Sequence, residues 1–163
     1  MPRKKASSED EIKIKNENTQ QKYIHAVGRR KEAVARVRLY PNVKNGFAWG
    51  DQKVKKGDVF VNKLPIEKYF SGEVAKVKYT EPFQLTNTFK RYVLTIRVEG
   101  GGLSGQLDAV ILGISRALAK LDSEKFRAIL KKKGFLTRDA RIRERRKVGM
   151  GGKSRRKRQS PKR

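Results

Sequence analysis

The chain has 163 residues, which suits one domain of ordinary size with flanking arms. Its 42 lysines and arginines outnumber its 16 aspartates and glutamates and leave a net charge of +26, so we expect an anionic partner. With no cysteine and one histidine, the sequence excludes a disulfide framework, a thiolate nucleophile and the common zinc sites. It has no apolar run long enough to span a membrane, and we expect a soluble, intracellular protein without metal, cofactor or membrane contact.

Composition divides the chain into three segments. Residues 1–21 carry both signs of charge and have only Ile12 and Ile14 to bury, so we predict a disordered arm. Residues 22–137 are predicted to form the globular domain. Residues 138–163 contain thirteen basic against two acidic side chains and too few apolar residues for a core. Such an arginine-rich arm is typical of a segment that threads RNA, and a solvated tail or a nuclear import signal is the alternative.

Alternating patterns predict strands in the middle segment. Residues 33–40 alternate apolar residues with Arg36 and Arg38, which indicates a half-buried strand with a basic outer face. Residues 91–98 repeat this pattern and direct Thr95 outward. Two shorter strands are expected at residues 22–27 and 58–61.

Periodic apolar residues predict helices later in the chain. A short helix is expected to begin with Pro65 as its first residue. Residues 104–121 carry an apolar stripe over several turns and are predicted to form the main core helix. A further helix is expected to be capped by Ser123, to turn Ile129 inward and to end at Gly134.

Two stretches are less regular. In residues 73–89, Val74 and Val77 suit a helical turn that Pro82 would bound. Residues 42–57, rich in glycine and lysine, predict a long hairpin loop. Because strands precede helices with little alternation between them, the pattern favours an α+β fold over a doubly wound sheet.

A glycine motif admits three interpretations. Gly100, Gly102 and Gly105 fit the dinucleotide-binding spacing, but Asp122 is expected to open a helix and not to follow a parallel strand. We therefore expect no nicotinamide or flavin binding. Either the glycines allow a tight turn, or their N–H groups and the following helix N-terminus receive a nucleic-acid phosphate.

Three other features each have a structural and a functional interpretation. Residues 28–31 place three cations in an expected loop between two strands, which favours contact with phosphate over a solvated turn. His25 is interpreted as a structural histidine and not as a catalytic base, because no cysteine or second histidine accompanies it. Phe47 and Trp49 either offer a stacking platform or pack back on their own domain.

Several different motifs follow one another along the chain. They are Gly28-Arg29-Arg30-Lys31 running on to Val37, Tyr69-Phe70, Gly100 to Gln106, Gly113 to Leu118, Gly134 to Arg141, Glu144 to Lys147 and the final Lys162-Arg163. Together they cover about residues 23–163. In these motifs the sequence resembles the small-subunit ribosomal protein nine family in its bacterial form.

The resemblance implies a small mixed sheet with helices packed on one face, like the second domain of ribosomal protein five, plus an extended basic C-terminal tail. The implied partners are small-subunit ribosomal RNA (rRNA), neighbouring proteins of the subunit head and the peptidyl-site transfer RNA (tRNA), on cytoplasmic ribosomes. Lys162 and Arg163 would face the tRNA. With the basic strand face and the glycine turn included, the expected rRNA-binding residues are Arg29, Arg30, Lys31, Arg36, Arg38, Gly101, Gly102, Arg138, Arg141, Arg143, Arg145, Arg146, Lys147, Lys153, Arg155, Arg156, Lys157 and Arg158.

The sequence departs from the family pattern in three places. Gln159-Ser160-Pro161 stands where the family usually has Gln-Phe-Ser, which removes an aromatic ring and fixes a backbone angle near the tip of the tail. The loop at residues 42–57 is longer than expected. Residues 1–21 have no counterpart in the compact bacterial form.

We therefore expect a non-enzymatic structural protein of the small ribosomal subunit that recognises RNA by its shape and backbone. The alternative is an architectural, nucleoid-type DNA-binding protein with a basic arm, which the composition alone supports nearly as well. No predicted helix has the exposed polar face of a helix-turn-helix, and this argues against that alternative.

Overall fold

The computed structural model describes residues 22–43, 46–49 and 52–144. Its elements in chain order are β1 (Ile24–Arg30), β2 (Ala33–Tyr40), β3 (Phe47–Trp49), β4 (Gln52–Val54), β5 (Val59–Val61), β6 (Leu64–Pro65), α2 (Ile66–Tyr69), α3 (Glu73–Leu85), β7 (Val93–Glu99), α4 (Leu103–Leu121) and α5 (Ser123–Lys132). The predicted N-terminal arm and the tail from residue 145 onward lie outside the described residues.

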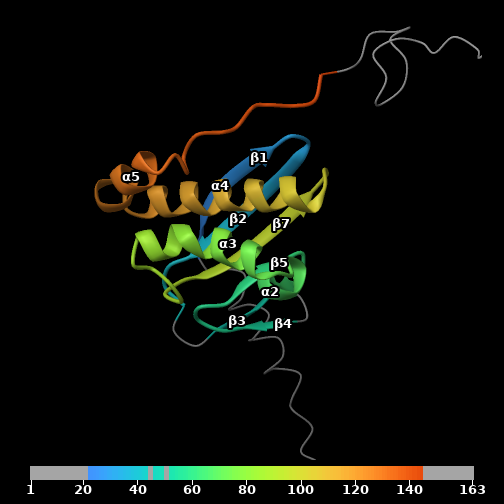
Figure 1. Cartoon of the computed structure of the whole chain (residues 1–163). Coiled ribbons are helices and arrows are strands. Elements are labelled where there is room, and N and C mark those ends of the chain that lie inside the picture. The colour runs from blue at the N-terminus through green and yellow to red at the C-terminus, as the bar shows by residue number, and fades with distance from the viewer. Residues whose placement is uncertain (1–21, 44–45, 50–51, 145–163) are drawn as a thin grey trace, which may run out of the picture.

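Five strands form a mixed sheet in the order β1-β2-β7-β5-β6. The β1–β2, β2–β7 and β5–β6 pairs are antiparallel, and β5 runs parallel to β7. Helices α3 and α4 lie side by side on one face of this sheet (Figure 1). The expected α+β fold, with a small mixed sheet and helices packed against it, is confirmed.

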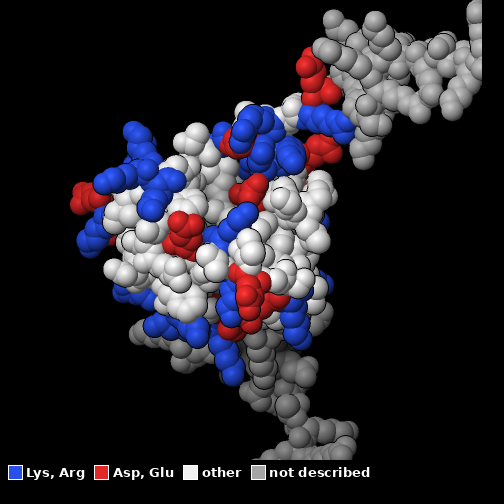
Figure 2. Space-filling view, in the orientation of Figure 1, with Lys and Arg blue, Asp and Glu red and all other residues white. Residues whose placement is uncertain are grey.

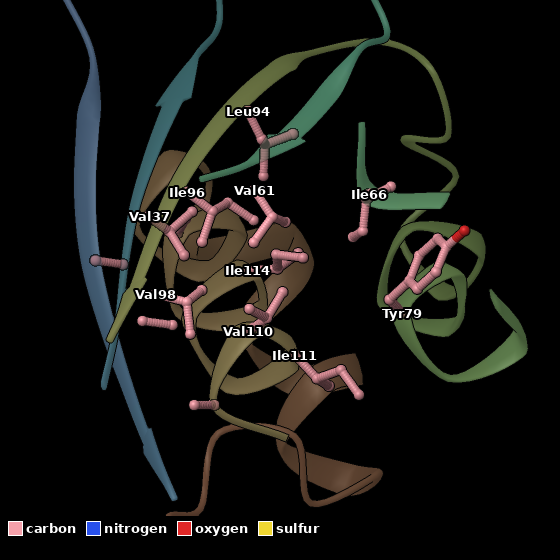
Figure 3. Packing of buried hydrophobic residues seen from close by; sticks show 14 of the residues in the cluster. Val37, Val61, Ile66, Tyr79, Leu94, Ile96, Val98, Val110, Ile111 and Ile114 are labelled. Carbon is pink, nitrogen blue, oxygen red and sulfur yellow. The ribbon is translucent and has the colours of Figure 1, made fainter. Parts of the chain in front are cut away.

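The main core lies between the sheet and the helices (Figure 3). Alternate residues of β2 and β7, such as Val37 and Ile96, point toward α4 because successive side chains of a strand face opposite sides. The apolar stripe of α4, which includes Val110 and Ile114, meets them as the sequence predicts. Tyr79 of α3 and Ile66 of α2 belong to the same core and lie beside the α4 residues (Figure 3).

The opposite face of the sheet is partly covered, which the alternation does not predict. Strands β3 and β4 form a small antiparallel hairpin that belongs to the predicted long loop. Its Val54 packs with Tyr40 and Val93 in a second cluster, and the Trp49 ring lies 6.4 Å from that of Phe60. Trp49 therefore packs back on its own domain. Thr95, which neighbours Val93 along β7, is only 2% exposed, so the expectation that it faces solvent is wrong.

Several details of the helices also differ from expectation. Helix α3 continues through Pro82, which is buried in its last turn, and Val74 is 71% exposed instead of packing inward. Asp122, not Ser123, caps α5 by accepting a hydrogen bond from the backbone N–H of Lys125 (3.1 Å). With Leu130 as the buried residue of α5, Ile129 turns outward and is 42% exposed. The short helix begins one residue later than predicted, because Pro65 is its extended N-cap.

Strand β1 and helix α4 approach each other closely at two glycines. A Cβ added to Gly28 would collide with the carbonyl oxygen of Ala109 and lie 2.5 Å from the nitrogen of Gly113. A Cβ added to Gly113 would lie 2.6 Å from a Val37 methyl group. Only glycine at both positions allows this crossing, so these residues set the distance between sheet and helix.

Gly28→Ala is expected to lower the free energy of unfolding by about 2–3 kcal/mol, because the new methyl group meets backbone atoms that cannot turn aside. Urea titration of the full chain measures this change as a lower midpoint at unchanged slope. Gly102→Ala is the matched control, since a Cβ there meets nothing within 4 Å. Equal stability of the two variants would contradict the close crossing.

Candidate nucleic-acid interface

The outer face of the sheet, on the side away from the helices, carries rows of basic side chains across three strands. Arg36 of β2 pairs in register with Arg97 of β7, and Arg38 pairs with His25 of β1. Arg29 of β1 occupies the same face, because residues of adjacent strands that pair in register share a side of the sheet. The hairpin cluster covers only the end of this face near Tyr40 and Val93. We call the arginine-rich remainder the open sheet face.

One acidic residue lies among these cations. Glu99 forms ion pairs with Arg97 (2.8 Å) and with Arg36 (3.6 Å), and all three side chains are well exposed. The Arg38 guanidinium lies 4.9 Å from the centre of the Tyr23 ring, a cation–π contact that holds it against the sheet. The open sheet face therefore presents several arginines at fixed spacing and only partly neutralised. Such a surface suits phosphate oxygens.

Strand β1 divides the basic motif that the sequence analysis assigns to a loop. The strand continues through Arg30, and only Lys31 and Glu32 form the turn, where Lys31 has a φ of 51°. Arg29 and Arg30 consequently point to opposite faces of the sheet. The prediction of three cations together in one loop is wrong, because alternation within the strand separates them.

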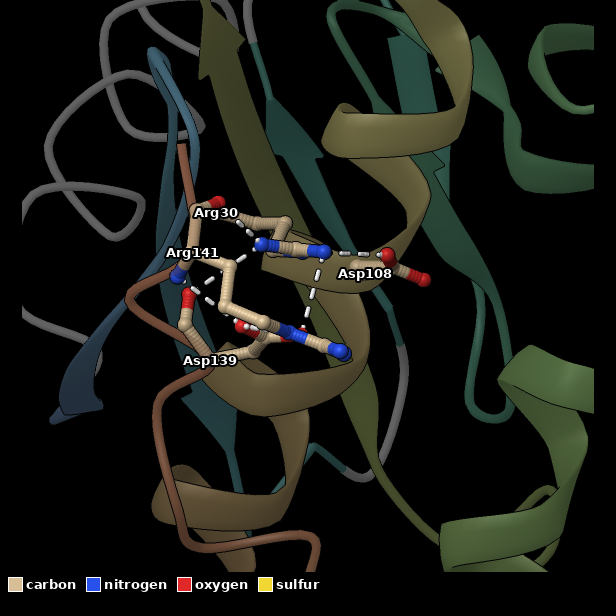
Figure 4. A network of polar contacts seen from close by, with 4 residues as sticks. All are labelled: Arg30, Asp108, Asp139 and Arg141. Carbon is tan, nitrogen blue, oxygen red and sulfur yellow. Dashed lines mark hydrogen bonds and ion pairs between the residues drawn. The ribbon is translucent and has the colours of Figure 1, made fainter. Parts of the chain in front are cut away.

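Arg30 turns toward α4 and is held by several partners (Figure 4). Its side chain is 15% exposed, and it forms ion pairs with Asp139 (3.0 Å) and with Asp108 of α4 (3.6 Å). Its Nη1 also donates hydrogen bonds to the carbonyl oxygens of Arg141 (2.7 Å) and Asp139 (3.4 Å). This internal engagement argues against the phosphate contact expected for Arg30.

Asp139 lies between two arginines. Arg141 donates hydrogen bonds from Nη2 (2.7 Å) and Nε (3.0 Å) to the Asp139 carboxylate, and its backbone N–H donates another (3.0 Å). These hydrogen bonds, followed by the charges of Arg141 and Arg30, hold the pKa of Asp139 well below its ordinary value of 3.8. The same pairing raises the pKa of Arg141. The network therefore stays charged throughout the neutral and mildly acidic range.

The end of α5 directs the chain back toward this network. Gly134, with a φ of 80°, follows the last turn, and its N–H donates to the carbonyl of Lys131 (3.0 Å). The N–H of Phe135 donates to the carbonyl of Leu130 (3.1 Å), which completes a Schellman motif. Phe135 and Leu136 then pack against the core. These contacts bring the first tail residues across the domain to Arg30.

The predicted basic residues of the tail are only partly described. Arg138, Arg141 and Arg143 are exposed. The others lie outside the described residues: Arg145, Arg146, Lys147, Lys153, Arg155, Arg156, Lys157, Arg158, Lys162 and Arg163.

The glycine segment before α4 forms a tight turn. Gly100 and Gly101 have φ values of 74° and 62°, and a Cβ on Gly100 would lie 2.6 Å from the carbonyl oxygen of Glu32. Gly102 is the N-cap of α4 and has open space around its Cα. Asp122 stands at the start of α5, as its N-cap, and does not follow a parallel strand. This arrangement supports the turn interpretation and is unlike a dinucleotide site.

Some basic residues near β1 were missed by the sequence analysis. Arg116 and Lys120 of α4 donate to the carbonyl oxygens of Val27 (2.8 Å) and His25 (2.9 Å) at the edge of the sheet. With Arg127 they line a groove of about 460 Å³ between β1 and the two last helices. The i, i+4 spacing of Arg116 and Lys120 could have indicated a shared helix face. The pairing of Arg97 with Arg36 required the strand register.

The helical side has a different character (Figure 2). Over α3 and α4, blue basic side chains lie mainly toward the margins and red acidic ones are interspersed. Within residues 22–43, 46–49 and 52–144, no three acidic or histidine side chains gather as metal ligands. No helix in the same part of the chain is long and apolar enough to cross a membrane.

Comparison with known proteins identifies related chains. The family model for ribosomal protein S9/S16 matches residues 28–163. The small ribosomal subunit protein uS9 of Rickettsia bellii (strain OSU 85-389) is 43% identical over 140 residues, which covers 86% of this chain and 76% of the relative. The uS9 protein of Amoebophilus asiaticus (strain 5a2) is 44% identical over 126 residues, which covers 77% of this chain and 88% of the relative. That of Chlorobium luteolum (strain DSM 273 / BCRC 81028 / 2530) is 45% identical over 126 residues, which covers 77% of this chain and 87% of the relative.

The lowered pKa of Asp139 predicts how the network responds to acid. A carboxyl group with a lower pKa in the folded state stabilises the fold above its unfolded pKa, and this contribution is lost as pH falls through the folded pKa. We therefore expect NMR titration of the Asp139 carboxyl carbon to give a midpoint well below 3.8. Arg141→Gln should raise that midpoint, and Arg143→Gln should leave it unchanged. A native midpoint of 3.8 or higher would show that the pairing does not form.

Proposed function

Since the chain belongs to the ribosomal protein S9/S16 family and is a structural, RNA-binding protein of the small ribosomal subunit, we propose that it holds rRNA of the subunit head with the open sheet face and the basic tail. The final residues of the tail would reach the peptidyl-site tRNA. The neighbouring proteins of the head would complete its surroundings.

The open sheet face is the observation that carries this proposal. Arg29, Arg36, Arg38 and Arg97 project from three hydrogen-bonded strands, so their spacing is fixed before RNA binds. Glu99 restrains two of them and leaves their side chains exposed. Preorganised guanidinium groups lose little side-chain entropy on meeting phosphate, and each contact releases counterions from the RNA. The surface suits a phosphate backbone and offers no pattern of base-reading side chains.

Other predicted contacts are assigned differently. Lys31 and the turn at Gly101 and Gly102 remain proposed phosphate contacts, because Lys31 is exposed and Gly102 has open space around it. Arg30 is removed from the proposed contacts because its guanidinium is used inside the domain. Arg138 and Arg143 remain proposed contacts at the base of the tail. Arg141 is assigned differently, because its guanidinium pairs with Asp139.

The tail supplies most of the remaining charge. Residues 145–163 contain ten basic side chains and no acidic ones, so an extended arm of this composition can replace counterions along an RNA groove. By the family resemblance, Lys162 and Arg163 are the residues that face the tRNA backbone. They would add positive charge without reading the tRNA sequence.

Replacing Arg36, Arg38 and Arg97 together with alanine is expected to weaken binding to small-subunit rRNA and to flatten its salt dependence. The logarithm of the association constant falls as the logarithm of the salt concentration rises. Each lost phosphate contact should make this slope shallower by roughly 0.7 to 0.9. Filter binding across a salt series measures the slope. Alanine at Lys131, Lys132 and Lys133, at the exposed end of α5, removes the same charge elsewhere and should change the slope less. Equal slopes for the two triple variants would contradict the proposed face.

Deleting Lys162 and Arg163 is expected to leave incorporation into small subunits intact and to weaken retention of tRNA in the peptidyl site, because only the tip of the tail is lost. Sedimentation of the tagged chain checks incorporation, and tRNA dissociation from purified subunits measures retention. Failure of the shortened chain to incorporate would assign these residues to assembly.

A further inference from the structure

We propose that Arg30 is a positioning residue for the basic tail: its guanidinium fixes the place and direction in which the chain leaves the globular domain. The inference rests on the proposed function in one respect, since it gives the tail its RNA-binding role. The geometry itself involves only described residues of the domain and of the tail base.

Each of the three nitrogen atoms of the Arg30 guanidinium contacts a partner within the protein. Nε faces Asp108 on α4 (3.6 Å), Nη2 faces the Asp139 carboxylate (3.0 Å), and Nη1 reaches the Arg141 carbonyl (2.7 Å). Asp108 and the strand position of Arg30 belong to the rigid domain, whereas Asp139 and Arg141 belong to the chain after α5. One side chain therefore connects the domain to the start of the tail (Figure 4).

The contacts restrain the path of the tail and not only its charge. Nη1 of Arg30 donates to two backbone carbonyls, so the main chain at Asp139 and Arg141 must pass on a particular side of β1. The Arg141 side chain folds back on the same Asp139 carboxylate. Arg138 and Arg143, on either side of this attachment, remain exposed. The attachment thus leaves nearby cations free to meet phosphate.

Positioning affects RNA binding through entropy. Leu136 packs against the core, so a chain without the Arg30 contacts would be free after that residue. It would sample many more directions than one held at Arg141, and RNA would have to order those residues on binding. Holding the base beforehand reduces that ordering. Loss of the attachment should therefore weaken rRNA binding while the number of phosphate contacts, and hence the salt slope, stays the same.

Two substitutions separate the attachment from general stability. Arg30→Lys keeps the positive charge and removes the planar fork, so it cannot satisfy Asp108, Asp139 and the carbonyls together. Asp139→Asn leaves the Arg30–Asp108 pair inside the domain and weakens only the tail contact. The matched control is Arg29→Lys, since Arg29 precedes Arg30 on the same strand and faces the other side.

The test measures the tail directly in the RNA-free full chain. Because the sequence has no cysteine, spin labels on Lys132→Cys and Ile142→Cys report one distance between the end of α5 and the exposed tail base. We expect a narrow distance distribution in the otherwise native chain and with Arg29→Lys, and a broad one with Arg30→Lys and Asp139→Asn. Circular dichroism should show that each labelled variant is folded.

Binding to small-subunit rRNA supplies the second measurement. Arg30→Lys and Asp139→Asn should weaken binding several-fold at an unchanged salt slope. A narrow distribution that persists in both variants would overturn the proposal. A reduced slope in Asp139→Asn would also overturn it, because that substitution removes no cation and should remove no phosphate contact. The distance distribution is measured without RNA, so it decides the positioning role even if the native chain fails to bind rRNA.

Discussion

The close crossing of β1 and α4 at Gly28 and Gly113 sets the geometry on which the interface depends. Helix α4 runs antiparallel to β1, and polar contacts join the two elements at both ends. Arg30 pairs with Asp108 at one end, and Lys120 donates to the carbonyl oxygen of His25 at the other. Twelve helical residues rise about 18 Å, and five strand residues span about 17 Å, so the contacts remain in register. A side chain larger than hydrogen at Gly28 or Gly113 would push β1 and α4 apart and break these polar contacts.

Strand β1 gives two neighbouring arginines different roles. Arg29 joins the open sheet face, and Arg30 turns inward to hold the base of the tail. Alternation of side chains along one strand therefore places Arg29 on the open sheet face and Arg30 beside the base of the tail. The Schellman motif at Gly134 brings the chain back within reach of Arg30, so the arm begins beside the sheet that supports it.

The sequence predicts the elements whose periodicity is strong and misses features that depend on distant partners. The stripe of α4 and the alternation at Arg36 and Arg38 are confirmed, because one buried face decides each of them. Thr95 is buried between strands that are distant in the sequence, with Arg38 of β2 and Phe60 of β5 as its register partners, and no local pattern encodes these neighbours. The inward turn of Arg30 depends on where β1 ends, and the wrong strand boundary placed it in a loop. The roles of the tail residues beyond 144 remain predictions.

The most direct test of the account is ultraviolet cross-linking of intact small subunits from the organism's own cells, with mass spectrometry of the peptides joined to RNA. The account predicts cross-linked peptides from β2 and β7 around Arg36 and Arg97 and from the tail after Arg141. It predicts none from the exposed end of α5 at Lys131 and Lys132. Cross-links concentrated on α5, with none on the open sheet face, would contradict the proposed mode of RNA binding.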